Sequence, residues 1–158
     1  MTWMYRNKVY VPKNLDPKIL YGFVYEITNK DNGKKYIGKK FFWSVKSYQK
    51  NKKRKKKKVE SDWQDYYGSS ELLLEDLNKI GAEQFDRKIL RLCKTKSECA
   101  YFEAKYQFDY KVLESDEYYN SWIMVKVRKS HLNRLWGVYM KVEYVNHMGD
   151  DITVVNSA

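Results

Sequence analysis

Two tyrosines, Tyr25 and Tyr36, lie in the stretch whose residue types and spacing could support chemistry. A run of β-branched and aromatic residues over 22–28 leads into residues 29–33, which contain an Asn-Gly step, and a second short segment, 34–38, follows with the apolar pair Tyr36-Ile37. This pattern predicts a β-hairpin. Because the two tyrosines would sit on facing strands, their phenols could converge on one site.

The chemistry open to such phenols depends on what surrounds them. A phenol has a pKa of about 10 and is a poor base at neutral pH. A cationic neighbour or a metal ion lowers that pKa and makes proton transfer easier. Lysines flank the second tyrosine and would supply positive charge: Lys34, Lys35, Lys39 and Lys40. The alternative is an ordinary hairpin in which tyrosine serves as a strand former.

The strongest charge feature is the basic tract, residues 46–58, which contains no acidic residue. The formal net charge of the 158-residue chain is +11, which predicts a polyanionic partner. Nucleic acid is the first expectation, and an anionic membrane surface is the weaker rival because no basic helix with a long apolar face is evident. A block of like charge repels itself, so we expect the tract to be mobile when unbound.

Three interpretations of the basic tract compete: a clamp on DNA phosphates, a localisation-like string and a solvated loop. Its position directly after the hairpin favours the clamp, in which each neutralised phosphate releases counterions. The residues predicted to bind DNA in this way are Lys39, Lys40, Lys50, Lys52, Lys53, Arg54, Lys55, Lys56, Lys57 and Lys58.

Length and composition set the remaining bounds. A chain of 158 residues with 43% hydrophobic and 16% aromatic content is expected to form one folded domain with short extensions. Two cysteines, Cys93 and Cys99, cannot supply a four-cysteine zinc site and read as small core residues. No signal peptide or membrane span is evident, so a reduced cytoplasmic setting and no membrane contact are expected.

The elements that would position the tyrosines follow from capping and periodicity. Ser70 and Gly81 bracket a predicted helix over 71–80, a strand is predicted over 84–92, and a longer helix begins at 95–97 and continues to 113. The aromatic residues 41–43 are expected to start a helix or to pack beside the sheet. The fold class is therefore α/β (α+β), with a small, mainly antiparallel three-stranded sheet flanked by helices.

The two ends of the chain are expected to lie outside this core. Residues 1–20 hold both prolines and predict an arm with a short strand near 8–11. Residues 124–158 form a C-terminal extension in which 136–145 and 151–155 could pair as strands. The predicted organisation is thus an arm over 1–20, a domain over 21–123 with the basic insertion 46–58, and the extension 124–158.

The hairpin resembles the motif of the GIY-YIG nucleases. The half-motif Tyr36-Ile37-Gly38 is intact, and the other half is Phe23-Val24-Tyr25, which keeps its tyrosine but not its glycine and isoleucine. The spacing of the tyrosines and the Ile-Thr-Asn…Asn-Gly-Lys connection also agree. The resemblance covers roughly residues 21–123. It implies a metal-dependent DNA endonuclease, with the compact, basic character of phage-encoded homing or host-DNA-degrading members.

The resemblance also implies roles for individual residues. Glu103, on the long helix after the third strand, takes the place of the family's metal-binding glutamate and would hold Mg²⁺ or Mn²⁺. Tyr25 or Tyr36 would act on the attacking water, and Asn120 would fix geometry by hydrogen bonding. Glu98 is a weaker candidate because it looks like a first-turn helix residue.

One departure concerns the cation near the phosphate. The family usually has an arginine on a helix after Tyr-Ile-Gly, and the usual interval leads here to Lys46. Lysine cannot make the bidentate contact of arginine, so either Lys46 substitutes or Lys40, Arg54 or Arg87 reaches in. This departure keeps open a non-cleaving nucleic-acid-binding protein on the same fold. A structural or protein-inhibiting module is a further alternative, and a homodimer is open because one centre per chain nicks a single strand.

Overall fold

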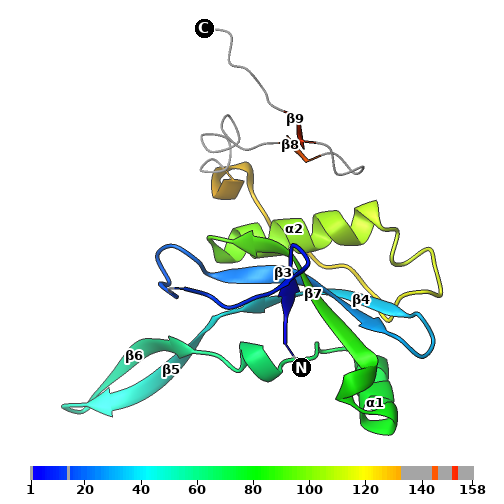
Figure 1. The fold of residues 1–158 in the computed structure, drawn as a ribbon. Helices are drawn as coiled ribbons and strands as arrows, with labels where there is room; N and C mark the ends of the chain where they lie inside the picture. The colour runs from blue at the N-terminus through cyan, green and yellow to red at the C-terminus, as the bar shows by residue number, and fades with distance from the viewer. Residues whose placement is uncertain (1, 14, 133–143, 146–150, 153–158) are drawn as a thin grey trace, which may run out of the picture. The chain divides into compact units, whose positions relative to one another are not determined.

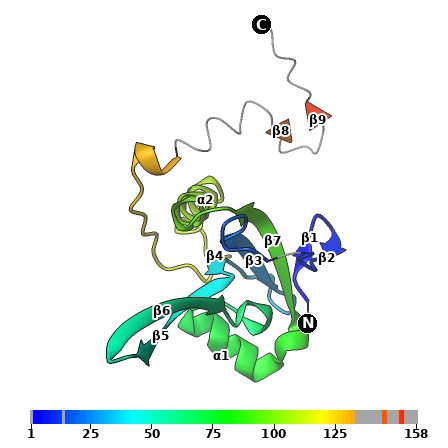
Figure 2. The same cartoon turned by 90° about the vertical axis from the view of Figure 1, so that its left-hand side faces the viewer.

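The hairpin that carries both tyrosines forms one side of a five-stranded sheet in this computed structural model, which describes residues 2–13, 15–132, 144–145 and 151–152. The strand order is β2-β1-β7-β3-β4 (Figures 1 and 2; β1 and β2 are labelled in Figure 2). β1 pairs with β7 in parallel, and the other pairs are antiparallel. The mainly antiparallel α+β fold is confirmed, but the predicted three strands are five: β1 Met4–Tyr5, β2 Lys8–Val9, β3 Gly22–Asn29, β4 Lys35–Phe41 and β7 Phe85–Cys93.

The two additional strands come from the segment 1–20, which the sequence assigned to an arm. A two-residue turn with positive φ at Arg6 and Asn7 joins β1 to β2. Trp3 is buried: its ring lies 4.9 Å from that of Phe23, and its Nε1 donates to the Trp63 carbonyl at 2.8 Å. Each strand is two residues long. β1 pairs with β7, which is far along the chain and which local pattern could not reveal, whereas β2 pairs with β1 and lies where a short strand was predicted near 8–11.

Helices α1 (Glu71–Ile80) and α2 (Lys96–Asp109) lie on opposite faces of the sheet (Figures 1 and 2). The predicted boundaries of α1 are confirmed, because the Ser70 hydroxyl accepts from the Leu73 amide and Gly81 ends the helix with φ 88°. Leu73 is fully buried and packs in the core. The helix thereby closes the face of β3 that carries Tyr25.

Helix α2 begins at the predicted cap, where the Thr95 hydroxyl accepts from the Glu98 amide at 3.1 Å. It ends at Asp109, whereas the sequence predicted a helix to 113. Lys111 takes φ 53°, and the Val112 amide donates back to the Gln107 carbonyl at 3.1 Å. A residue in the left-handed backbone region just after the last turn is a common way for an α-helix to end. It turns Val112 into the core, where 1% of its surface is exposed.

The basic tract is the largest local difference from the sequence prediction. It lies in a separate two-stranded antiparallel sheet made of β5 (Trp43–Lys50) and β6 (Lys53–Glu60), which the sequence did not predict. Asn51 and Lys52 both have positive φ, which is the pattern of a two-residue hairpin turn. Phe41 ends β4, Phe42 is fully buried, and Trp43 begins β5, so residues 41–43 do not start a helix.

The core confirms the predicted alternation along β3. Phe23, Tyr25 and Ile27 share one face and are enclosed by aromatic residues such as Phe42 and Trp63. Residues up to Lys126 form one compact unit and residues from Val127 form another. In the second unit, β8 (Tyr144–Val145) pairs with β9 (Asp151–Ile152). The rest of the pairing predicted for 136–145 and 151–155 lies outside the described residues.

Candidate active site

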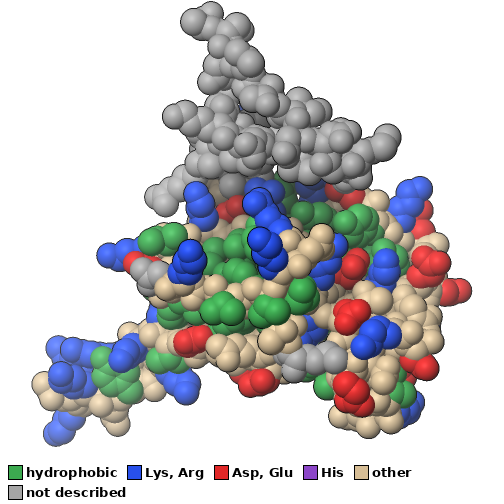
Figure 3. All heavy atoms as spheres, viewed as in Figure 1, with side chains coloured by type: hydrophobic (Ala, Val, Ile, Leu, Met, Phe, Trp, Pro, Cys, Tyr) green, Lys and Arg blue, Asp and Glu red, His purple; other side chains and the backbone are tan. Residues whose placement is uncertain are grey.

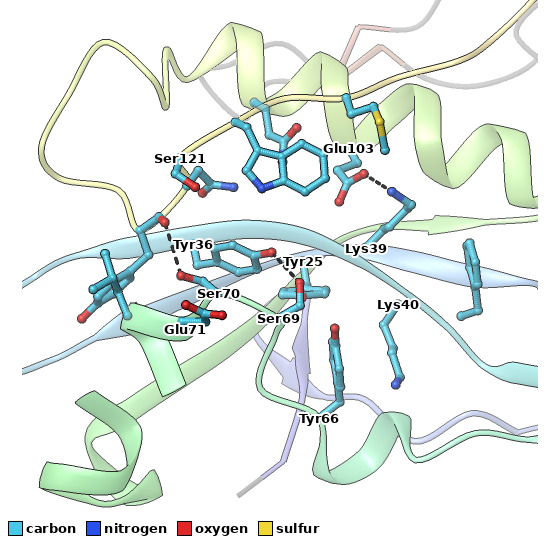
Figure 4. A pocket seen from close by; sticks show the side chains of 17 residues that line it. Tyr25, Tyr36, Lys39, Lys40, Tyr66, Ser69, Ser70, Glu71, Glu103 and Ser121 are labelled. Carbon is cyan, nitrogen blue, oxygen red and sulfur yellow. Dashed lines mark hydrogen bonds and ion pairs between the residues drawn. The ribbon is translucent and has the colours of Figure 1, made fainter. Parts of the chain in front are cut away.

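A pocket of about 750 Å³ opens at the edge of the sheet formed by β4 (Figure 4). Residues 117–119 run along this edge: the Lys35 amide donates to the Glu117 carbonyl, and the Tyr119 amide donates to the Lys35 carbonyl, both at 2.8 Å. The pocket gathers residues from β3, β4, α2 and this last segment. Six of the predicted site residues line it: Tyr25, Tyr36, Lys39, Lys40, Glu103 and Asn120.

Register explains why the two tyrosines meet. Tyr25 lies directly opposite Gly38, and Tyr36 lies opposite Ile27, so the tyrosines are diagonal neighbours on one face. Their ring centroids are 6.1 Å apart. Tyr25 is 1% exposed, whereas Tyr36 is half-buried and its hydroxyl lies 3.3 Å from the Ser69 hydroxyl. Tyr36 is therefore the phenol that a ligand in the pocket can reach.

Burial sets the protonation of both phenols. It raises the pKa of Tyr25 well above its ordinary value, and the neighbouring Tyr36 adds to the rise. Burial also raises the pKa of Tyr36, while the hydrogen bond with Ser69 opposes the rise. The expectation that nearby lysines lower these pKa values is wrong, because burial raises the pKa of both phenols; Lys39 and Lys40 are paired with carboxylates.

Buried Tyr25 predicts a loss of stability in alkali. Below the unfolded-state pKa of about 10, both states hold the phenol proton; above it, the unfolded state ionises while the folded state does not. Stability should therefore fall as the pH rises beyond about 10, by up to about 1.4 kcal/mol per pH unit for this one group. Urea unfolding between pH 8 and 11 should show a smaller fall in Tyr25→Phe than in the wild type. Equal slopes would contradict this assignment.

Glu103 extends from α2 toward β4, and its side chain is 12% exposed. Its carboxylate forms an ion pair with the Lys39 ammonium (Figure 4). Burial raises the pKa of Glu103, and the bond with Lys39 opposes that rise. The carboxylate is thus partly desolvated and matched to a cation.

The donor set fits a divalent ion held by one protein carboxylate. No group of three or more His, Cys, Asp or Glu that could hold a metal occurs among the described residues. Mg²⁺ commonly binds through one or two carboxylates while water and substrate phosphate oxygens complete its octahedron. Glu103 would be the protein ligand, and the Lys39 ammonium would then leave the carboxylate and become available to a phosphate.

Asn120 holds the strand that carries the second half-motif. Its Nδ2 donates to the Ile37 carbonyl at 2.8 Å, and its Oδ1 accepts from the Ile37 amide at 2.9 Å. Gln107 of α2 donates to the same carbonyl at 3.1 Å. These bonds satisfy backbone groups at the sheet edge, where no further strand of the described residues pairs with β4. They fix the backbone between Tyr36 and Gly38.

The remaining predicted cations lie elsewhere. Lys46 stands on β5, is exposed, and is not among the residues that line the pocket. Arg54 is on β6 of the same hairpin. Arg87 is buried and donates to the carbonyls of Gln64 and Tyr66 at 2.8 and 3.1 Å. The positive charge that lines the pocket therefore comes from Lys39 and Lys40 on β4.

Sequence reasoning missed Tyr66. Its ring lies 6.2 Å from that of Tyr25, and the Lys40 ammonium sits 3.7 Å from its centroid. Lys40 also pairs with Asp62 at 2.6 Å. The loop that contains Tyr66 is bound by Arg87, which donates hydrogen bonds to the carbonyls of Gln64 and Tyr66. The available sequence signal was the aromatic pair Tyr66-Tyr67 directly before Gly68-Ser69-Ser70. From local pattern alone, this stretch is typical of an ordinary turn before a helix.

Comparison with known proteins gives consistent matches. A family model described as "Putative endonuclease segE, GIY-YIG domain" matches residues 3–123. The curated protein named "Putative endonuclease segE", from Enterobacteria phage T4, is 35% identical over 102 residues, which make up 64% of this chain and 40% of that protein. The matched region thus spans less than half of that relative. No solved structure matches at a significant level, and no described helix has the length and apolar character needed to cross a bilayer.

Proposed function

Because the chain belongs to the GIY-YIG family, in the group of the phage endonuclease segE, we propose that it is a metal-dependent endonuclease that hydrolyses phosphodiester bonds in DNA. The observation that carries the proposal is the convergence of the Glu103 carboxylate, the Lys39 ammonium and the Tyr36 hydroxyl in one open pocket. Around a phosphodiester, a carboxylate can hold a metal ion, a cation can stabilise developing charge, and an accessible phenol can contact the attacking water.

We assign the roles by position. Glu103 holds Mg²⁺ or Mn²⁺, which supplies Lewis acidity and orients the scissile phosphate. Tyr36 contacts the attacking water because it is the phenol open to the pocket, and buried Tyr25 packs beside it and restricts its ring. Lys39 and Lys40 contact phosphate oxygens. Asn120 positions the backbone of Tyr36 and Gly38 through Ile37 and does not touch the substrate.

Lys46 takes a different proposed role from the one its sequence interval implied. Its place on the exposed hairpin suits a phosphate outside the pocket, as does the rest of the basic tract. Figure 3 shows Lys and Arg side chains gathered along this projecting hairpin. We propose that the tract binds the duplex on one side of the cleavage point.

The second candidate function is a DNA-binding protein that has lost cleavage. The observation that favours it is that no arginine lines the pocket in the described part of the chain. Its discriminating property is tight, salt-sensitive binding of DNA without turnover.

Cleavage of supercoiled plasmid tests the proposal directly. We expect nicking or linearisation with Mg²⁺ or Mn²⁺ and none with chelator. Binding without cutting under either metal would move the assignment to the second candidate, and failure to bind DNA at low salt would overturn both. Linear product that forms without prior accumulation of nicked circles would show that two chains cut together, as a homodimer would. A homing or host-DNA-degrading role in the cytoplasm of an infected cell is the biological setting we propose.

A further inference from the structure

The hairpin of β5 and β6, called here the ribbon (residues 43–60), has two chemically different faces. Strand alternation and register put Ser47 opposite Lys56 and Gln49 opposite Arg54 on one face, here called the reading face. The other face, here called the lysine face, carries Tyr48 and five lysines: Lys46, Lys50, Lys53, Lys55 and Lys57. The ribbon is exposed on both faces from 45 to 58.

Positive charges of the ribbon lie close to one another and, among the described residues, are not paired with carboxylates. Lys46 faces Lys57, and Lys50 faces Lys53, so like charges stand directly opposite each other. Such pairs destabilise a hairpin. Within the described residues, no lysine or arginine of the ribbon forms an ion pair. A polyanion is the partner that removes this repulsion.

The reading face holds the side chains that can distinguish bases. Arginine binds the O6 and N7 atoms of guanine with two hydrogen bonds, and glutamine binds the N6 and N7 atoms of adenine in the same way. Gln49 and Arg54 are directly opposite each other near the tip of the ribbon, with Ser47 and Lys56 behind them. The lysines of the opposite face, turned away from the base edges, would contact phosphates, which carry no direct sequence information.

We propose that the ribbon enters the major groove of duplex DNA with its reading face toward the base edges and its lysine face toward the flanking phosphates. This inference rests on the proposed function, since it assumes that DNA is the substrate. The major groove is about 12 Å wide and admits a two-stranded ribbon, whereas the minor groove is about 6 Å wide. The long lysine side chains on the outward face can reach the phosphates on both walls of the groove.

Two double variants of the full chain test the contributions of the reading face and of the lysine face separately. Gln49→Ala with Arg54→Lys keeps the net charge but removes the planar amide and the planar guanidinium fork, leaving at position 54 a point charge that fixes base geometry less strictly. Lys46→Gln with Lys57→Gln removes two charges and leaves the reading face intact. All four side chains are exposed, and circular dichroism checks the fold. Binding is measured in chelator, so that no DNA is cut, by sequencing duplexes selected from a random library and by the salt dependence of affinity.

The reading-face variant should lose about tenfold or more in affinity for the selected duplex, with an unchanged salt slope and a flattened sequence preference. The lysine-face variant should keep the preference, bind all duplexes more weakly, and reduce the salt slope by about 2. Replacing purines in the selected duplex by their 7-deaza analogues, which lack the N7 acceptor, should weaken the wild type about as much as the reading-face change.

An unchanged preference in the reading-face variant, no preference in the wild type, or indifference to 7-deaza purines would each overturn the inference. Metal-dependent plasmid cleavage by the wild type separates this failure from that of the proposed function. If cleavage persists in any of those cases, the ribbon does not read bases but the nuclease assignment stands. If the protein neither binds nor cuts DNA, both are overturned.

Discussion

Replacing Glu103 by glutamine should reduce the rate of metal-dependent plasmid cleavage by about a thousandfold or more. Glutamine keeps the shape of the side chain but lacks the charge that holds a divalent ion. The loss corresponds to about 4 kcal/mol of transition-state stabilisation, a reasonable share for a metal ion that acts as a Lewis acid. The measurement is single-turnover cleavage across a titration of Mn²⁺, in which excess metal should not restore the wild-type rate.

The fold should survive this change. The Lys39 side chain is 31% exposed, so its ammonium can turn to water when the carboxylate is lost. Duplex binding in chelator should therefore remain, and the thermal midpoint should change by a few degrees at most. Glu114→Gln is the matched control, because Glu114 is exposed just beyond α2 and does not line the pocket. Cleavage by Glu103→Gln at the rate of this control would place the metal elsewhere.

Local sequence signals predicted the parts of the fold whose causes are local. The Asn-Gly step and the alternation of Phe23, Tyr25 and Ile27 predicted the hairpin and the buried face. Ser70 and Gly81 predicted both ends of α1, because capping involves residues close in sequence. The position of Glu103 on α2 came from the resemblance to the family and not from periodicity, and the structure places its carboxylate in the pocket.

The features that were missed depend on long-range packing. Strand β1 was missed because it pairs with β7 and follows Trp3, which packs against Phe23 and Trp63, all of them distant in sequence. β2, in contrast, lies where a short strand was predicted near 8–11. The ribbon was missed for another reason: its lysines obscured a two-residue turn at 51–52 and strand formers such as Tyr48. Charge repulsion argued for mobility, but regular hairpin pairing from 43 to 60 is what the structure shows.

The site illustrates the same division between local and long-range causes. Spacing alone brought Tyr25 and Tyr36 together, since both belong to one hairpin. Tyr66 reaches the pocket because Arg87, on β7, holds the carbonyls of its loop. Lys46 misses the pocket because the chain after Phe42 continues as a strand pointing away and not as a helix folding back. The phenol pKa values were misjudged because burial outweighs the lysines, which have carboxylate partners.

Replacing Gly38 by alanine should impair both tyrosines at once. A Cβ at this position would lie 2.5 Å from the Tyr25 hydroxyl oxygen and 2.8 Å from Cε1 of Tyr36. Tyr25 cannot withdraw, because it is 1% exposed and the Trp3 ring lies 5.2 Å from its own. We expect a loss of about 1–3 kcal/mol in the free energy of unfolding from overpacking. We also expect cleavage to fall by about a hundredfold or more, because displacement of catalytic groups by about 1 Å has effects of that size.

Gly33→Ala separates the two consequences. Gly33 has φ 75° in the hairpin turn, and no atom lies within 4 Å of a Cβ built there. Alanine at this position should cost about 1 kcal/mol in stability through its backbone conformation while leaving the pocket intact. Urea unfolding and single-turnover cleavage of both variants give the comparison. Adding Tyr25→Phe to Gly38→Ala removes the hydroxyl contact and should recover part of the stability. If Gly38→Ala cuts as fast as Gly33→Ala, the close approach of this glycine to the two phenols does not control the site.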